Sequence, residues 1–488
     1  MSLAFQASQA LPRGTDYLRI LPELVLSIFG MIIMVLDPVV DQRRNQKALG
    51  TLALIGSLAA IASTLWQARA PGLAFWNMVQ VDTFSVFFHF LITTITAVVI
   101  LTSYEYMEVQ QIRVGEYYAL ILFGAVGMCL MSSAVELVLI FIALEISSIS
   151  TYILAGFRRR AAISSEASIK YFLLGSFATA FFLYGVALMF GATGSTSIPT
   201  IEQHLRSGSI PVLAYVAIAL MFVGLGFKVA AAPFHVWTPD VYEGAPAPIV
   251  GFMSTAPKAA VFAVLLRIMF QIHAPGRLGL IWVAAALSMT LGNIGALVQQ
   301  NVKRLLAYSS IAHAGYLLVA FAALPQNGIP SAMFYTASYA AMNIGAFAVV
   351  SHFGGAGERY VTLEDYSGLG RRSPVLAAAL TLFLLSLIGI PITAGFFAKF
   401  YVFSAALQAN LVGLVIIGVI NSAVAAYYYL RVIVVVYMHD PRDESVLPAV
   451  PLELGAALAI TALTTIYLGL LPGRVLDYAS RSAGDLLH

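Results

Sequence analysis

The chain has 488 residues, of which 60% are hydrophobic and only 10% are charged, and its formal net charge is +3. Soluble domains carry about 25% charged residues, so this composition excludes a water-soluble enzyme and indicates a protein embedded in a lipid bilayer. The sequence has no basic patch that would indicate binding of nucleic acid, and it has no glycine-rich phosphate-binding motif that would indicate a nucleotide site. The single cysteine, Cys129, excludes an iron–sulfur cluster held by this chain alone, because such clusters need about four cysteine ligands.

A membrane-spanning helix needs about 20 mainly apolar residues. This criterion predicts an all-α, polytopic membrane protein of about 14 transmembrane helices. Met1 to Tyr17 lack the basic start, apolar core and small-residue site of a cleavable signal, so we expect the first helix to be a retained span. The expected spans are residues 18–36, 48–66, 82–103, 116–134, 135–157, 165–192, 211–243, 246–273, 278–299, 302–323, 329–353, 374–408, 409–438 and 450–471.

Lysine and arginine residues in the loops set the expected orientation, because cytoplasmic loops carry an excess of them. The loops that follow odd-numbered helices hold thirteen such residues, and the opposite side, termini included, holds seven. This asymmetry predicts that both termini lie on the outer side. The run Arg158–Arg160 is interpreted as a topology anchor.

The seventh and twelfth segments, residues 211–243 and 374–408, are too long for simple spans, and each contains an internal proline, Pro233 or Pro391. Proline removes one helical hydrogen bond and clashes with the preceding turn. Backbone freed in this way at membrane depth is tolerated only where it is buried in protein or lines a wet cavity. We therefore expect both segments to be discontinuous helices, with a proline kink or a long tilted helix as the alternative.

The two interrupted segments indicate an internal repeat. They lie five helices apart, so helices 4–8 and helices 9–13 form two blocks with the interrupted helix fourth in each. Because each block has an odd number of helices, the second enters the membrane from the opposite side, as in many transporters. The expected domains are an N-terminal three-helix segment (1–115), two inverted five-helix repeats (116–273 and 278–438), and helix 14 with a short tail (439–488).

Four ionisable residues lie well inside the expected spans: Glu145, Lys228, Lys258 and Lys399. A charge at a helix centre costs about 2.5–3.5 kcal/mol on insertion scales, so each needs a partner, water or a function. Lys228 and Lys399 also flank the two expected helix breaks. Structural ion pairs between helices are the alternative to a functional line.

Two histidines extend this set, because His313 is central in helix 10 and His235 follows the first expected break. A histidine takes and releases protons near neutral pH. The alternative for each is a core histidine bonded to a backbone carbonyl, and no second ligand lies at a metal-site spacing. Sodium and calcium sites need several oxygen ligands, whereas this set is rich in lysine. The set therefore indicates proton exchange.

Other charged residues are weaker candidates. Glu166 and Lys170 lie one turn apart, which favours a pair on the helix surface. Glu105 and Arg267 lie near the ends of helices, where long side chains can reach the membrane surface. For the cluster Tyr427–Tyr429 we expect packing, with hydroxyls that order water in a cavity as the alternative.

Three stretches carry a resemblance to a known family: GFKVAAAPFHVWTPDVYEGAP from Gly226, STAPK from Ser254 and KRLLAYSSIAHAGY from Lys303. In them the chain closely resembles the antiporter-like subunits of respiratory complex I (NADH-quinone oxidoreductase), and the subunit N family in particular. The likeness extends over about helices 1 to 14. The short tail after helix 14 differs from the long lateral helix of subunit L, and Lys399 replaces a glutamate of subunit M. The D-like component of the Mrp-type sodium/proton antiporters is the second candidate.

The resemblance implies a functional order for these residues. Glu145 on helix 5 pairs with Lys228 on helix 7, Lys258 on helix 8 continues the line, and Lys399 on helix 12 closes it. It implies a proton-translocating subunit of an NADH-quinone oxidoreductase, with His313 and His235 as further proton-transfer residues. An unrelated solute transporter or a structural scaffold is a third possibility.

The resemblance also implies what surrounds the chain. NADH, FMN, iron–sulfur clusters and quinone are expected on partner subunits, and no cofactor or metal on this chain. The expected partners are other membrane subunits of complex I, namely the antiporter-like M subunit and small subunits such as K. The expected location is the inner membrane of a bacterial cell.

Overall fold

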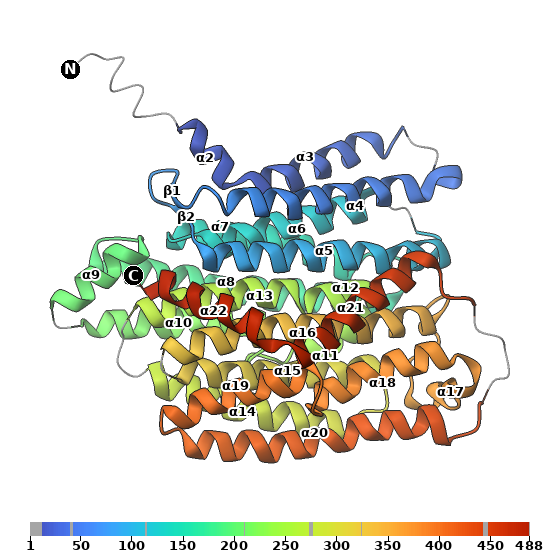
Figure 1. Ribbon diagram of the computed structural model, residues 1–488. Coiled ribbons are helices and arrows are strands. Elements are labelled where there is room, and N and C mark those ends of the chain that lie inside the picture. Colours follow the sequence, from blue (N-terminus) through green and yellow to red (C-terminus); the bar gives the residue numbers. More distant parts are fainter. Residues whose placement is uncertain are drawn as a thin grey trace.

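The computed structural model describes residues 12–39, 42–112, 115–208, 210–272, 277–323, 325–442 and 448–487. Its long helices run side by side across the molecule (Figure 1). Within these described ranges, 12 helices are long and apolar enough to cross a membrane, and Leu21–Leu36 (α3) and Pro374–Ile388 (α18) are shorter apolar helices. The expected all-α, polytopic membrane fold is confirmed.

The N-terminal part contains three long helices and a small hairpin. The helices are α3, Gln42–Gln67 (α4) and Thr83–Gln110 (α5), with the short Gly14–Arg19 (α2) in front of them. Between α4 and α5 the strands Gly72–Ala74 (β1) and Val79–Val81 (β2) pair antiparallel, with Gly72 opposite Val81. The hairpin is absent from the expected elements because strands of three residues are too short to show an alternating pattern.

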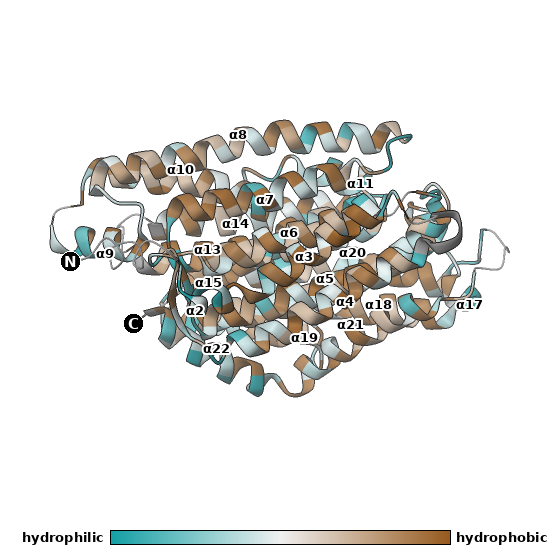
Figure 2. Ribbon diagram, turned by 90° about the horizontal axis from the view of Figure 1, so that it is seen from above, coloured by the Kyte–Doolittle hydropathy of each residue, from teal (hydrophilic) through white to brown (hydrophobic). Residues whose placement is uncertain are grey.

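The helices of the two expected repeats follow in chain order. The first block contains Gly115–Ser133 (α6), Leu137–Ala155 (α7), Ala162–Thr193 (α8), Ile198–Ser207 (α9), Val212–Val229 (α10), Thr238–Gly244 (α11), Ala247–Met253 (α12) and Ala256–Gln271 (α13). The second contains Arg277–Leu297 (α14), Val302–Ala322 (α15), Pro325–Gly354 (α16), Leu363–Tyr366 (η1), Leu369–Arg372 (α17), α18, Ala394–Gln408 (α19) and Val412–Met438 (α20). Seen from above, α8 and α10 form one edge of the bundle (Figure 2).

Both expected interruptions are present. Helix α10 ends at Val229, where Ala230 takes the left-handed conformation (φ 61°), and α11 begins only at Thr238. Helix α18 ends at Ile388, where Gly389 has φ 96°, and α19 begins at Ala394. Both long segments are therefore pairs of half-helices.

A third interruption was not expected: the span predicted over 246–273 is present at Ala247–Phe270, but it consists of the two helices α12 and α13. The chain leaves the helix at Ser254 and Thr255, between α12 and α13. Pro257 has no N–H to donate and its fixed φ suits the first turn of a new helix. The hydroxyls of Ser254 and Thr255 donate to the Gly251 carbonyl at 3.0 and 2.7 Å, which satisfies an acceptor at the end of α12.

The loops of the two blocks make matching contacts. Glu136, the N-cap of α7, forms an isolated β-bridge with Ser197, and Asn301, the N-cap of α15, forms one with Thr362. The two bridges span the same number of residues (136 to 197 and 301 to 362), and each joins the residue before the second helix of its block to the loop after the third helix. This correspondence supports the expected repeat.

The matching junctions lie at opposite ends of α5. Beside the first junction, Val135 N–H donates to the Met78 carbonyl in the hairpin that precedes α5. Close to the second, Glu358 accepts a hydrogen bond from Tyr106 near the end of α5. Because α5 runs from one face to the other, the second block is inverted relative to the first.

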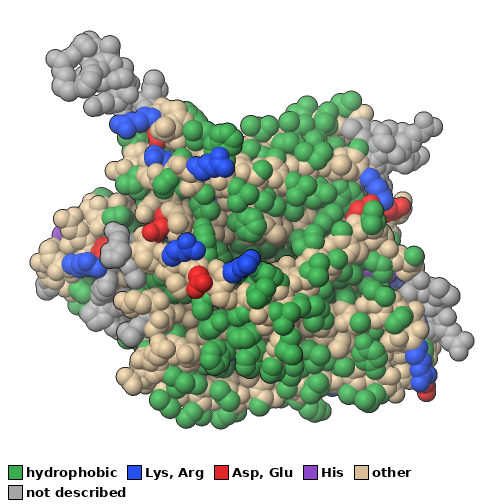
Figure 3. Space-filling model, viewed as in Figure 1, with side chains coloured by type: hydrophobic (Ala, Val, Ile, Leu, Met, Phe, Trp, Pro, Cys, Tyr) green, Lys and Arg blue, Asp and Glu red, His purple; other side chains and the backbone are tan. Residues whose placement is uncertain are grey.

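The C-terminal part contains Leu452–Leu470 (α21) and Pro472–Leu487 (α22). Helix α22 occupies most of the tail that was expected to follow helix 14, and it packs on α16 and α5. Tyr478 donates to the Thr83 carbonyl at 3.2 Å, which fixes α22 to the start of α5. The space-filling view shows a broad hydrophobic surface with charged side chains toward the two ends of the bundle and over α22 (Figure 3). This surface fits a bilayer, where the middle of the protein faces lipid.

Candidate functional site

The expected site residues come from six different elements. Glu145 lies on α7, Lys228 in the last turn of α10, His235 between α10 and α11, Lys258 on α13, His313 on α15 and Lys399 on α19. Lys228, Lys258, His313 and Lys399 are buried, with 3–6% of each residue exposed. Three of these four residues lie on half-helices, where the interrupted backbone leaves carbonyl groups without helical partners.

Lys228 is held by aromatic residues. Its Nζ donates to the Tyr152 hydroxyl at 3.0 Å and lies 4.5 and 5.1 Å from the ring centres of Tyr152 and Tyr171. Such cation–π contacts stabilise an ammonium group away from water. Tyr152 lies on α7, so the lysine of α10 is bound to the helix that carries Glu145.

Glu145 is half-buried, and its Oε1 has no hydrogen-bond partner. Its charge acts on Lys228 and on Tyr152. Among the described residues no ion pair joins Glu145 to Lys228. The resemblance implied an ion pair between Glu145 and Lys228. In the structure Glu145 acts on Lys228 from a distance, and the residue that contacts the lysine directly is Tyr152.

Lys258 contacts the second block. Its Nζ donates to Ser310 Oγ at 2.6 Å and to the Ser310 carbonyl at 3.3 Å. The two side chains line a small cavity together with His313, Tyr335 and Tyr339. The cavity has a volume of about 10 Å³, which is just enough to hold one water molecule.

His313 lies between two of the lysines. The charges of Lys258 and Lys399 both act on its ring. Its Nδ1 lies 2.7 Å from the Tyr335 hydroxyl and its Nε2 lies 3.5 Å from the Tyr429 hydroxyl, which contacts Ser309. Each ring nitrogen thus faces a hydroxyl, which can donate or accept a hydrogen bond.

Lys399 is bound to the end of a half-helix. Its Nζ donates to the carbonyls of Ile388 and Leu387 at 2.8 and 3.2 Å, at the C-terminus of α18. The C-terminus of a helix carries partial negative charge, so this position favours an ammonium group. The Tyr316 ring lies 4.7 Å from Nζ and 5.6 Å from the His313 ring, so it contacts both residues.

His235 stands apart from these contacts. It is half-buried next to the exposed Val236, and its Nδ1 has no hydrogen-bond partner. In the described structure no hydrogen bond or ion pair joins His235 to Glu145 or to the buried lysines. The structure therefore brings Lys258, His313 and Lys399 together and leaves His235 outside this group.

Tyr152, Tyr335 and Ser310 are the contacts that sequence reasoning missed. All three types are common in apolar helices, and they carry no charge that would single them out. Of the cluster Tyr427–Tyr429, for which packing is expected, Tyr428 and Tyr429 are buried whereas Tyr427 is exposed, and Tyr429 also reaches His313. The expected surface pair of Glu166 and Lys170 is present at 2.7 Å.

Two residues that were expected to reach the membrane surface form buried pairs instead. Arg267 is fully buried and binds both carboxylate oxygens of Asp82 at 3.1 and 3.0 Å. Glu105 contacts His352 Nδ1 at 2.8 Å. The pairing partner in each case comes from a distant part of the chain, so the ends of these helices are covered by protein rather than by headgroups.

Glu358 links several elements at one end of the bundle. Its carboxylate accepts from Lys303 Nζ at 2.8 Å, from the Tyr106 hydroxyl and from Ala247 N–H at 2.9 Å, and Arg158 lies at 3.4 Å. Burial alone raises the pKa of Glu358, but the charges of Lys303 and Arg158 outweigh burial and hold the pKa below its usual value. Arg158, expected as a topology anchor, is thus also part of a buried ionic cluster.

The comparisons with known proteins agree with this geometry. Residues 134–425 match the family described as NADH:quinone oxidoreductase/Mrp antiporter, transmembrane. NADH-quinone oxidoreductase subunit N 2 of Koribacter versatilis is 65% identical over 97% of this chain and 98% of its own length. Subunit N of Trichlorobacter lovleyi is 44% identical over 95% of this chain and 96% of its own length.

Solved structures give the same result. A chain of respiratory complex I from Thermus thermophilus with bound aureothin is 38% identical, with a TM-score of 0.81 over 94% of this chain and 99% of that chain. A chain of the Mrp complex from Dietzia sp. shares the fold with a TM-score of 0.84 over 96% of this chain and 98% of that chain, at 21% identity. Together with the interrupted helices and the buried lysines, these similarities show that the chain belongs to the subunit N family of NADH-quinone oxidoreductase, the antiporter-like membrane subunits of respiratory complex I.

Proposed function

We propose that this chain moves protons across the membrane through Lys228, Lys258, His313 and Lys399, with Glu145 controlling the charge on Lys228. The observation that carries the proposal is the position of His313: it lines one cavity with Lys258, the Tyr316 ring beside it also contacts Lys399, and a hydroxyl faces each of its ring nitrogens. Imidazole can accept a proton at one nitrogen and release one from the other. This is the chemistry that a relay between two amines requires.

The transfer begins at Lys228. An electric or conformational signal from a neighbouring subunit moves Glu145 away, and Lys228 loses the charge that favours its ammonium form. The Tyr152 hydroxyl, which can accept and donate, keeps the lysine in place. The proton then passes through water to Lys258, to His313 by way of the cavity beside Ser310, and on to Lys399.

Lys399 completes the path at the second interrupted helix. The carbonyls of Leu387 and Ile388 hold its ammonium group, so it accepts a proton without a carboxylate partner. Arrival of the next proton at His313 repels the charge on Lys399 and favours release to the outer side. His235, which lies outside this group, takes no part in the transfer in this scheme.

The chain acts as one membrane subunit of an enzyme complex and carries out no redox step itself. NADH, FMN, iron–sulfur clusters and quinone bind to partner subunits. The neighbours in the bilayer are the antiporter-like M subunit and small subunits such as K, in the inner membrane of a bacterial cell with both termini on the outer side. The thirteen-to-seven bias of loop arginine and lysine residues supports this orientation.

Sodium/proton antiport of the Mrp type is the second candidate. The shared fold with the Dietzia Mrp complex favours it, but a sodium site needs several oxygen ligands close together. Glu145 is the one carboxylate among the residues of the line, and lysines repel a metal cation. The identity of 65% to a subunit N favours the complex I function.

The experiment uses the assembled complex in inverted membrane vesicles. Lys228→Ala and Glu145→Gln are compared with the wild type and with Lys170→Ala, which changes a lysine at the surface. The rate of NADH oxidation and the build-up of a proton gradient are measured in the same vesicles, with and without sodium. We expect a lower ratio of protons moved to NADH oxidised in the two line variants and none of this loss in Lys170→Ala. Normal pumping in complexes that assemble normally would contradict the proposal, and sodium-dependent pumping would favour the antiporter function.

A further inference from the structure

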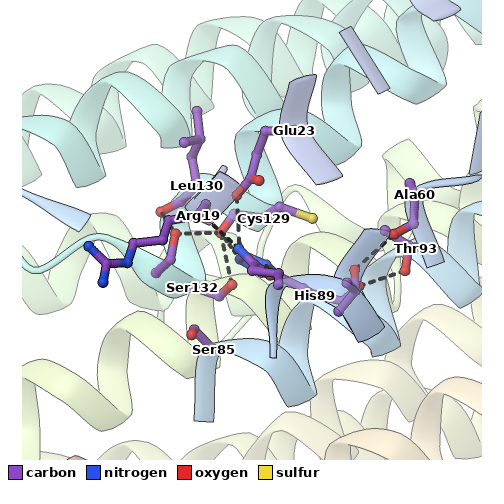
Figure 4. A network of polar contacts seen from close by, with 12 residues as sticks. Arg19, Glu23, Ala60, Ser85, His89, Thr93, Cys129, Leu130 and Ser132 are labelled. Carbon is purple, nitrogen blue, oxygen red and sulfur yellow. Dashed lines mark hydrogen bonds and ion pairs between the residues drawn. The ribbon is translucent and has the colours of Figure 1, made fainter. Parts of the chain in front are cut away.

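A second cluster of ionisable residues lies in the N-terminal three-helix part, away from the lysine line. Glu23 is in the first turn of α3 and His89 is on α5, 3% and 0% exposed. Gln67, the last residue of α4, and Cys129 of α6 complete the cluster. Figure 4 shows the Glu23 carboxylate and the Cys129 main chain both directed at the His89 ring.

The orientation of Gln67 follows from its two contacts. Its Nε2 donates to the Arg19 carbonyl at 2.5 Å, and a carbonyl oxygen can only accept. The amide oxygen Oε1 is therefore the atom that faces His89, 2.9 Å from Nδ1. Because Oε1 is also an acceptor, Nδ1 of His89 must carry a proton.

The other ring nitrogen faces acceptors as well. His89 Nε2 lies 2.9 Å from the Cys129 carbonyl and 3.5 Å from Glu23 Oε1. The Cys129 carbonyl can only accept a hydrogen bond, and it also accepts one from the Ser132 hydroxyl. Nε2 must therefore carry a proton too, and with both nitrogens protonated the imidazole ring is a cation.

The charge of this cation is balanced by Glu23. Both oxygens of Glu23 are buried and lack a hydrogen-bond partner, so His89 is the one cationic group in contact with this carboxylate in the described structure. The nearby charges of Asp82 and Arg267 are paired with each other and act on His89 in opposite directions. The Arg19 guanidinium points away from His89 (Figure 4) and donates to loop carbonyls of residues 70–73. Among the described residues, the Cys129 thiol is a further titratable group beside Glu23.

We propose that Glu23 and His89 form a proton-binding site separate from the lysine line, in which His89 holds the proton as an imidazolium and Glu23 is its counter-ion. Transfer breaks the Nε2–H bond and forms an O–H bond at Glu23 Oε1, which converts the ion pair into a neutral acid and a neutral imidazole. The unpartnered oxygens of Glu23 leave room for this proton. A polar pocket of ≈ 200 Å³ beside Asp16 and Arg19 lies at the same end of the bundle.

The test uses the assembled complex with three variants: Glu23→Gln, His89→Gln and the double variant. The matched control is Glu202→Gln with His204→Gln, which neutralises a glutamate and a histidine on α9. We expect each single variant to lower the amount of assembled complex severalfold, because each leaves one buried charge without its partner. The double variant restores assembly to within about twofold of the wild type, because it removes both charges.

Assembly separates the ionised pair from its alternatives. Glutamine has the shape of a protonated glutamate, so wild-type assembly of Glu23→Gln shows a neutral acid and overturns the proposal. A double variant that assembles no better than the single variants shows that charge balance does not hold the pair, which also overturns it.

Infrared spectroscopy tests the bound proton. The difference spectrum between acidic and neutral pH is recorded in light and heavy water. We expect the wild type and the α9 control to show a carboxylic-acid band that shifts in heavy water and is missing from the double variant. The proposal is overturned if the double variant keeps this band. Pumping through the lysine line is measured separately, so failure of one proposal does not decide the other.

Discussion

Lys228 donates a hydrogen bond of 3.0 Å to the Tyr152 hydroxyl and lies over the same ring. Tyr152 and Glu145 are seven residues apart on α7, which is about two helical turns, so both side chains face the same side of the helix. The lysine is therefore held by a neutral group, while the carboxylate acts on it from further away. This arrangement lets Glu145 move without releasing Lys228.

Tyr152→Phe tests this relationship. The change removes the hydroxyl and keeps the ring, so Lys228 keeps its cation–π contact and loses its hydrogen bond. We expect assembly to stay normal and the ratio of protons pumped to NADH oxidised to fall severalfold. Tyr184→Phe, an exposed position on α8, is the control and leaves the ratio unchanged. Full pumping in Tyr152→Phe would show that the hydroxyl plays no part.

Gly389→Ala tests the link between the second helix break and Lys399. Gly389 has φ 96°, and a Cβ at this position meets Lys399 Cδ at 3.3 Å. We expect the strained backbone to cost about 1–3 kcal/mol and the displaced lysine to lower pumping. Thermal unfolding and proton pumping of the complex are the two measurements. Gly413→Ala, where nothing lies within 4 Å of the added methyl group, is the control. Unchanged values in both measurements would contradict the prediction.

Arg267→Ala removes one partner of the buried pair with Asp82. An uncompensated carboxylate remains in the protein interior, and we expect a loss of about 3–5 kcal/mol. The amount of assembled complex and its thermal unfolding temperature report the effect. Arg159→Ala breaks the exposed pair with Glu116 and should cost less than about 1 kcal/mol. Equal losses of stability in Arg267→Ala and Arg159→Ala would contradict the prediction, because they would show that removing one partner of a buried ion pair costs no more than removing one partner of an exposed pair.

Glu358 predicts a pH dependence. Its pKa lies below the usual value of 4.5, so its ionised form stabilises the folded protein. This contribution is fully present above the unfolded pKa and is lost as the pH falls through the lower folded pKa. We expect the unfolding temperature of the complex to drop more steeply below about pH 4.5 in the wild type than in Glu358→Gln, which has no such group to protonate. Parallel curves for the two proteins would exclude this role.

Much of the fold follows from local properties of the sequence. Hydropathy gives the spans, and the prolines and small residues give the two expected breaks, because missing hydrogen bonds act within one helical turn. The third break, between α12 and α13, could not be predicted because Pro257 lies in the first turn of α13, and proline is equally common in the first turn of an ordinary helix. Charged residues inside a predicted span, such as Lys258, can be recognised from the sequence because burying a charge in a membrane is costly.

The sequence by itself thus determined that the chain spans a membrane, that two of its long segments are interrupted and that Lys228, Lys258 and Lys399 lie inside it. Only the tertiary structure decided what those charges contact. Arg267 meets Asp82 across 185 residues, and His352 meets Glu105 across 247. Tyr152, rather than Glu145, is the direct partner of Lys228. Hydropathy and proline effects are local, whereas a side chain's partner depends on the packing of helices from distant parts of the chain.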